Sequence, residues 1–176
     1  MRRESPSASP GPATTLLSTL VKSTSSGPLT DVALVAARIA LVWIFTYYGA
    51  GKLFATFNGP GLHRTALYFA NTAHLRPGGF FAVSAGVIEF GGAILLAVGL
   101  GARLAGLALL VDQVMAMITV TWVNGINSLT NNPGYEFNIT LAVLALIVAV
   151  LGAGRLSLDH LIEQRLRVAT PDVTAA

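Results

Sequence analysis

The sequence contains no cysteine and very few charged residues. Only 11% of its 176 residues are charged, whereas 53% are hydrophobic. The absence of cysteine excludes disulfide exchange, thiolate nucleophiles, Fe–S clusters and cysteine-ligated zinc. About a quarter of the residues in a soluble chain are charged, so this chain cannot cover a water-facing surface with polar groups. These absences exclude an ordinary cytosolic enzyme and favour a membrane protein.

Basic residues are in slight excess but are nowhere clustered. The 11 lysines and arginines, against 8 acidic residues, give a net charge of +3. Nucleic-acid-binding proteins gather such charges into a patch or stripe. Here the arginines lie singly near the expected helix ends, so we expect the lipid bilayer, and no nucleic acid, as a partner.

The N-terminal residues 1–31 are rich in serine, threonine and proline. A segment of this composition buries too little apolar surface to offset the entropy of ordering the chain. We therefore expect a disordered tail at 1–31 that is not cleaved as a signal peptide, and a second short tail at 171–176.

Four apolar segments lie within a membrane domain at 32–154. A helix rises 1.5 Å per residue, so about 20 residues cross a hydrocarbon core of roughly 30 Å. The fourth segment is expected to start with Asn132 as its N-cap and Pro133 at the first helical position. The sequence predicts an all-α fold, a four-helix transmembrane bundle with spans at about 32–54, 79–100, 102–122 and 133–151.

The positions of lysine and arginine indicate how the spans are oriented. Cytoplasmic loops carry an excess of these residues. One side of the predicted topology carries only Lys52, Arg64 and Arg76, whereas both chain ends and the corner at Arg103 are basic. Both termini are therefore predicted to be cytoplasmic.

Two further segments have amphipathic patterns. After the first span, Leu62, Ala66 and Phe69 share one face of a short helix. In the segment 155–170, Leu158 and Leu161 share an apolar face that excludes the charged residues. We predict interfacial helices at both places, the first on the outer surface and the second on the cytoplasmic surface.

Arg38, Glu89 and Asp112 lie well inside the spans. Ionisable residues are costly there and usually have a partner or a function. Small residues share the faces of both acids, which indicates that the acids point into the bundle, and Asn138 heads a similar stripe on the fourth span. We expect Asp112 to be the closer partner of Arg38, with Glu89 bridged to them or protonated. The alternative is an ion pair that only fixes helix register.

Lys52 and the histidines have simpler interpretations. We expect Lys52 to reach the membrane surface from the end of the first span, with a Lys52–Glu136 pair as an alternative. His63 and His74 are eleven residues apart, about 16 Å on one helix, and cannot bind one ion together. Because no span contains a histidine, we expect neither a haem nor a metal site.

Several motifs between residues 33 and 160 are similar to those of a known family. They are Arg38 in the first span, GAGKLF at its end, GVIEFGGAILLAVGLGARLAG across the second span, GYEFN before the fourth and GAGRLSLD after it. In combination they resemble the DoxX family of small bacterial four-helix membrane proteins. The resemblance implies a multi-pass protein of the bacterial plasma membrane and places Arg38, Glu89 and Asp159 at characteristic positions. The chain departs from the family at Thr121, where many members have a histidine.

The resemblance implies a redox setting, because the family is similar to the small subunit of a thiosulfate:quinone oxidoreductase and to membrane parts of oxidative-stress complexes. One hypothesis is a membrane subunit that binds a quinone, with Glu89, Asp112 and Arg38 as catalytic residues and Asn138, Arg38 and Glu89 holding the quinone. Soluble redox proteins on the cytoplasmic side would then supply electrons. Alternatives are a scaffold without enzyme activity that recruits such proteins, and, with less support, a small-solute or proton transporter. A homo-oligomer formed through the small-residue faces is also consistent with the sequence.

Overall fold

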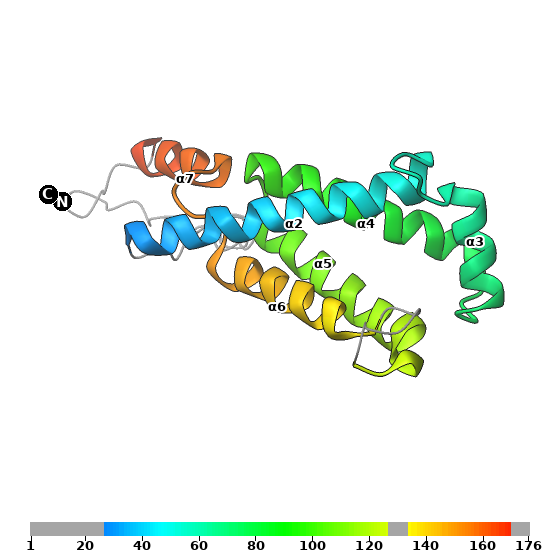
Figure 1. The fold of residues 1–176 in the computed structure, drawn as a ribbon. Coiled ribbons are helices and arrows are strands. Elements are labelled where there is room, and N and C mark those ends of the chain that lie inside the picture. The colour runs from blue at the N-terminus through cyan, green and yellow to red at the C-terminus, as the bar shows by residue number, and fades with distance from the viewer. Residues whose placement is uncertain (1–26, 127–133, 170–176) are drawn as a thin grey trace, which may run out of the picture.

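A computed structural model describes residues 27–126 and 134–169, and this part of the chain contains six α-helices and no strand (Figure 1). The predicted all-α class is confirmed. Residues 1–26 of the first predicted tail, the second tail, Asn132 and Pro133 lie outside the described residues. The tail prediction is wrong for residues 28–31, which form the first turn of α2 with Asp31 buried. The elements are α2 (Pro28–Phe54), α3 (Gly61–Asn71), α4 (Gly78–Val98), α5 (Ala102–Ala116), a π-helical turn η1 (Met117–Thr121), a 3₁₀ turn η2 (Trp122–Asn124), α6 (Glu136–Leu151) and α7 (Leu158–Ala169).

Within residues 27–126 and 134–169, three helical segments are long and apolar enough to cross a membrane. They are Pro28–Phe54, Gly78–Val98 and Ala102–Asn124, the last of which combines α5 with η1 and η2. The fourth apolar helix, α6, has 16 residues and is about 24 Å long. It is shorter than a typical hydrocarbon core. Three predicted spans therefore have matching helices, while the fourth span, the complete bundle and its orientation remain predictions.

Glycine forms the tight corner between α4 and α5. Gly99 and Gly101 have φ angles of +68° and +58°, which favour a residue without a side chain. The Gly99 N–H donates to the Leu96 carbonyl at 3.3 Å, and the Leu100 N–H donates to the Leu95 carbonyl at 2.9 Å. These two bonds form a Schellman motif, which ends α4 and lets α5 return beside it.

Small residues bring the apolar helices together. A Cβ atom on Gly49 of α2 would lie 2.5 Å from the backbone nitrogen of Phe90, and one on Gly106 would lie 2.8 Å from the Ala145 carbonyl oxygen. α2 therefore approaches α4, and α5 approaches α6, at backbone distance. The core between them is made by the buried side chains of Leu41, Phe45, Ala93, Leu96, Leu109, Leu141, Ala145 and Val148.

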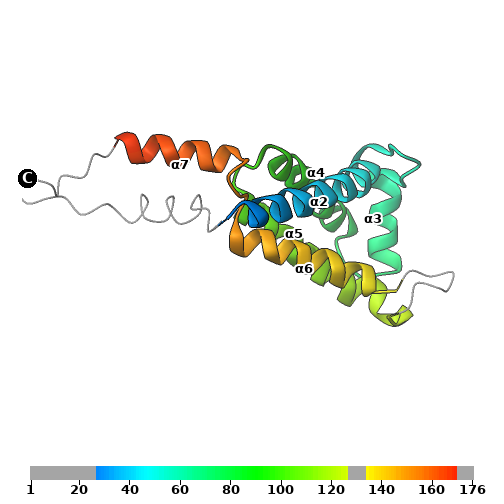
Figure 2. The same cartoon turned by 60° about the vertical axis from the view of Figure 1, so that its left-hand side comes forward.

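The two amphipathic segments form helices at opposite ends of the molecule. α3 packs against α4 at one end, while α7 leaves the assembly at the other, beside the start of α2 (Figures 1 and 2). α7 exposes Leu158, Leu161, Ile162 and Leu166 by 38 to 54%. Helices are thus present where the sequence predicts them, and their positions at the membrane surface remain predictions.

Candidate functional site

Arg38 lies on the buried face of α2 and binds backbone carbonyls rather than a carboxylate. Its Nε donates to Leu96 at 2.9 Å, and its Nη2 donates to Ala97 at 3.2 Å. Its Nη1 donates to Ala153 at 2.9 Å and to Leu156 at 2.8 Å. The first two carbonyls end α4, where helical carbonyls lack an internal partner, and the others connect α6 to α7. Arg38 therefore connects α2 to the end of α4 and to the segment between α6 and α7.

Asp159 and Asp31 complete the contacts around the start of α7. Asp159 accepts hydrogen bonds from the Gly101 N–H at 2.8 Å and from the Ala102 N–H at 3.1 Å. A carboxylate at this place caps α5 and suits the positive end of the helix dipole. Asp31 accepts a bond from the Arg155 N–H at 3.1 Å. We call Asp31, Arg38, Arg155 and Asp159 the α7 anchor.

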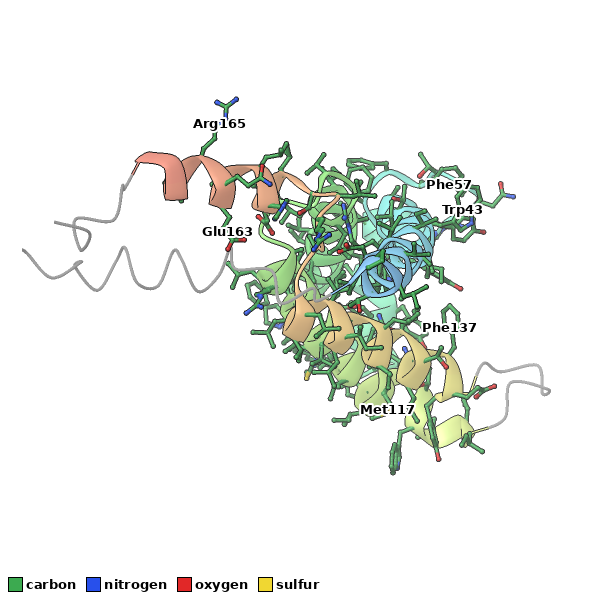
Figure 3. All side chains as sticks on the ribbon, turned by 90° about the vertical axis from the view of Figure 1, so that its left-hand side faces the viewer. Trp43, Phe57, Met117, Phe137, Glu163 and Arg165 are labelled. Carbon is green, nitrogen blue, oxygen red and sulfur yellow. The ribbon has the colours of Figure 1, made fainter. Side chains whose placement is uncertain are left out.

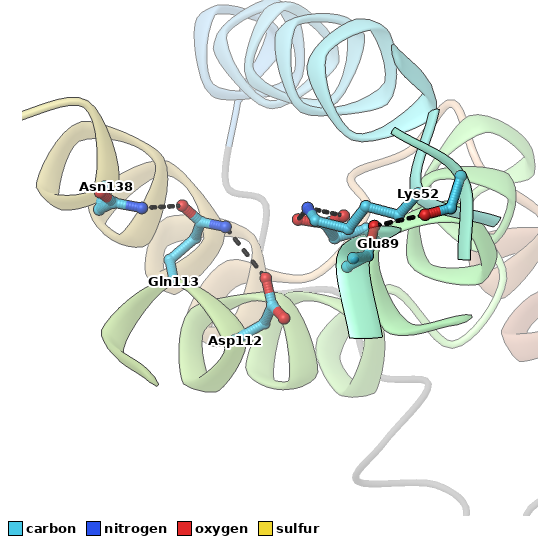
Figure 4. A network of polar contacts seen from close by, with 7 residues as sticks. Lys52, Glu89, Asp112, Gln113 and Asn138 are labelled. Carbon is cyan, nitrogen blue, oxygen red and sulfur yellow. Dashed lines mark hydrogen bonds and ion pairs between the residues drawn. The ribbon is translucent and has the colours of Figure 1, made fainter. Parts of the chain in front are cut away.

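Lys52 and Glu89 form an ion pair between α2 and α4. The Lys52 Nζ lies 2.6 Å from Oε1 and 2.5 Å from Oε2 of Glu89 (Figure 4). Glu89 is only 4% exposed. Both carboxylate oxygens thus share one ammonium group. The Lys52 Nζ also lies 5.6 Å from the centre of the Tyr48 ring, close enough for a cation–π contact.

A separate line of hydrogen-bonded side chains starts at Asp112, near this pair, and runs from α5 to α6 (Figure 4). Gln113 Nε2 donates to Asp112 at 3.0 Å, and Asn138 Nδ2 donates to the Gln113 Oε1 at 3.0 Å. The Thr121 hydroxyl donates to the Asn138 Oδ1 at 2.9 Å. Asp112 lies between Gln113 and the Lys52–Glu89 pair, within electrostatic range of both charges (Figure 4). We call Lys52, Glu89, Asp112, Gln113 and Asn138 the polar belt.

The polar belt brings together most of the residues predicted for the site, but it excludes Arg38. The expected Arg38–Asp112 contact is wrong. Arg38 binds the Leu96 carbonyl at the end of α4. Asp112 of α5 lies near Glu89, which precedes Leu96 on α4 by seven residues, or about 10 Å. The expected surface-reaching Lys52 is also wrong, as is its alternative pairing with Glu136, because its ammonium group binds Glu89.

Gln113 and Lys52 are the members of the polar belt that sequence reasoning missed as site residues. Gln113 is 4% exposed and faces the core, whereas Asp112 beside it is only half-buried. An amide inside an apolar helix is itself a signal, since such side chains bond across membrane helices. Lys52 was assigned to the membrane surface because it lies near the end of its helix. Its long side chain instead runs back to the middle of α4.

An open cavity lies beside Arg38, away from the polar belt. It is an open groove of about 810 Å³. Its lining is mostly apolar and comes from α2, the end of α4 and the segments around Phe57 and Leu156. A second cavity of about 130 Å³ touches Gln113 and Asn138 between α5 and α6. Ligand pockets usually measure 300 to 1,000 Å³, so of these two cavities the groove is the one with room for a small molecule.

The described residues include no group of three or more His, Cys, Asp or Glu side chains arranged to hold a metal ion. The polar belt and the α7 anchor are instead internally bonded sets.

Comparison with known proteins identifies a family for this chain. The model of the DoxX family matches residues 33–122, which include most of α2, all of α3, α4 and α5, and both Arg38 and Glu89. No curated protein and no solved structure matches the chain. The match covers half of the sequence and agrees with the resemblance carried by GAGKLF and GVIEFGGAILLAVGLGARLAG. The chain therefore belongs to the DoxX family.

Proposed function

We propose that this integral membrane protein is a four-span subunit of a redox complex in the bacterial plasma membrane, and that it binds a quinone in the groove beside Arg38. In this proposal α6 is the fourth span and both termini are cytoplasmic. The α7 end then faces the cytoplasm, and the α3 end faces outward. Membership of the DoxX family and the three apolar helices support the membrane part of the proposal.

The groove is the observation that carries the quinone proposal. Its volume of about 810 Å³ lies within the range of small-molecule sites. Its lining combines aliphatic side chains with a few groups able to orient polar atoms: Trp43, Thr46 and Tyr47. A quinone has a flat ring with two carbonyl oxygens and a long apolar tail, so an apolar groove with few polar groups fits it.

The protein's own residues have limited tasks in such a subunit. The Val35, Ile39 and Val42 side chains offer an apolar wall along α2, and Arg38 places a positive charge in the wall beside them. With no cysteine in the chain, electrons are expected to come from a soluble partner on the cytoplasmic side. A quinone supplies the electron-accepting chemistry when it is bound.

Glu89 and Asp112 receive a different task from the one expected. Neither lines the groove, and Glu89 is held by Lys52. The polar belt joins α2 to α4 and α5 to α6 by bonds between side chains. We therefore assign these acids to helix assembly and assign the quinone site to the groove.

Filling the groove tests this proposal. Ala97 is exposed and lines the groove, so Ala97→Phe should occupy part of it without disturbing the core. We expect saturable binding of decylubiquinone, measured by native mass spectrometry from phosphatidylcholine nanodiscs, to fall at least tenfold. Val87→Phe, at an exposed position of α4 outside the groove, should bind as wild type. Equal binding by both variants would rule out the groove.

The α7 anchor favours a second candidate function, a scaffold for soluble redox proteins. The anchor fixes the start of α7, while four apolar side chains of this helix remain exposed. A scaffold would keep its partners in Ala97→Phe and lose them in Leu161→Glu. A quinone-linked subunit would lose activity in Ala97→Phe while retaining its partners. Co-purification and quinone reduction, measured on the same two variants, separate the two functions.

A further inference from the structure

Trp43 is placed unusually for a tryptophan in a membrane helix. It is 80% exposed and lies 11 residues before the end of α2, about 16 Å from that end. Tryptophan prefers the membrane surface, where its N–H meets water. Among the described residues, none accepts a hydrogen bond from the indole N–H of Trp43. At this depth the N–H faces hydrocarbon, where an unsatisfied donor is costly.

Trp43 lines the groove, so a ligand bound there could accept a hydrogen bond from its indole N–H. Trp43 lines the groove together with Tyr47, whose ring stacks on Phe57 with the ring centres 5.5 Å apart. Trp43 and Phe57 lie on the same outer side of α2 (Figure 3). The opposite part of the groove is formed by Val35, Ala97 and Leu156. The groove therefore has an aromatic end with a free donor and an aliphatic end.

Arg38 has little capacity to donate a hydrogen bond to a carbonyl group of a ligand. Of its five N–H groups, four already donate to backbone carbonyls at 2.8 to 3.2 Å. Arg38 also lies about 8 Å from Trp43 along the axis of α2. A ring at the aromatic end thus meets an unused donor, whereas a ring beside Arg38 meets donors that are almost all occupied.

We infer that the groove holds the flat, carbonyl-bearing ring of a quinone-type lipid against Trp43, with the indole N–H donating to one carbonyl. This inference rests on the proposed function and adds the position of the ring. The ring lies beside the Tyr47–Phe57 stack, where offset contacts between flat rings are favourable.

The chain contains its own control, because it has only two tryptophans. Trp122 lies outside the groove and stacks on Tyr135. Trp122→Phe leaves Trp43 as the sole fluorophore, and Trp43→Phe leaves Trp122. Both residues are exposed, at 80% and 58%, so both variants should fold. Quinone rings quench tryptophan fluorescence at short range, so each variant reports the distance of the ring from one known position.

The experiment titrates decylubiquinone into each variant in phosphatidylcholine nanodiscs, with binding measured in parallel by native mass spectrometry. We expect saturable quenching of Trp43 in Trp122→Phe and only weak, linear quenching of Trp122 in Trp43→Phe. Loss of one hydrogen bond should also weaken binding to Trp43→Phe roughly fivefold. Saturable binding without selective quenching of Trp43 would overturn this inference and leave the proposed function standing. Absence of saturable binding to the wild-type protein would overturn both.

Discussion

The α7 anchor and the polar belt both bury charge among apolar helices, but they satisfy it with different partners. In the anchor, Arg38 binds four backbone carbonyls, two in the last turn of α4 and two in the segment between α6 and α7. In the polar belt, Lys52 binds Glu89, and Gln113 binds both Asp112 and Asn138, so side chains depend on other side chains. The contacts of Arg38 therefore depend on the shape of one cation, and the belt depends on side chains that match one another.

Variants of the Lys52–Glu89 ion pair should lose the most unfolding free energy, and the loss should differ between the two partners. Lys52→Met leaves the buried Glu89 carboxylate without its cation and should cost about 3–5 kcal/mol of unfolding free energy. Glu89→Gln should cost less, because the Lys52 side chain is 21% exposed and can turn toward the membrane surface. The double variant Lys52→Met with Glu89→Gln should be more stable than Lys52→Met alone. Titration with dodecyl sulfate in mixed micelles measures all three, and equal losses in both single variants would contradict this asymmetry.

Arg38→Lys tests whether the anchor needs the shape of the guanidinium group. A lysine keeps the charge, but its single ammonium group cannot reach carbonyls of both α4 and the segment before α7. We expect a loss of roughly 2–3 kcal/mol in the same titration. Limited proteolysis should show new cleavage near Leu156 in this variant and none there in Lys52→Met. An Arg38→Lys protein with wild-type stability would show that charge alone is sufficient.

Asp159→Asn should have a smaller effect on the other half of the anchor. Each carboxylate oxygen of Asp159 accepts a different N–H, and asparagine retains one accepting oxygen. We expect a cost of about 1 kcal/mol, as for a weakened helix cap, and about twice as much for Asp159→Ala. The ratio of the two losses reports how much the second oxygen contributes. It is read from the same unfolding curves.

The amide contacts of the polar belt should give the smallest effect. Gln113→Leu removes the bonds to Asp112 and Asn138, and Asn138→Leu removes those to Gln113 and Thr121. The Gln113–Asn138 bond is the one that both variants remove. Bonds of this kind between membrane helices contribute about 0.6 kcal/mol on average, so a double-mutant cycle should return a coupling energy near that value. A coupling as large as that of Lys52 and Glu89 would remove the distinction between ionic and amide parts of the belt.

Much of the fold follows from local patterns. Apolar length and glycine corners predict α2, α4 and the α5 segment, because such features act within one helix. The start of α6 was less predictable, since Asn132 and Pro133 have the residue types of a helix start while the described helix begins at Glu136. The motifs GAGKLF and GVIEFGGAILLAVGLGARLAG predicted the family, which the comparison confirms.

The site was harder to predict because it depends on the offset of neighbouring helices along their axes. Counting from helix ends placed Lys52 at the surface and Glu89 at mid-depth. In the structure, Gly49 lies against Phe90 and Gly86 against Leu53, which brings the end of α2 to the middle of α4. The partners of Arg38 are backbone carbonyls, which leave no trace in a pattern of side chains.

The contacts of Arg38 also impose an order on the synthesis of this protein. Its carbonyl partner at Leu156 is 118 residues away, and the one at Ala153 is 115 residues away. At about 5–20 residues per second, a ribosome needs roughly 6–24 seconds to make that stretch. The first membrane helix therefore waits with part of the Arg38 guanidinium unbonded until Leu156 has been translated. A nascent chain stopped before Ala153 lacks two of the four carbonyl partners of this buried cation.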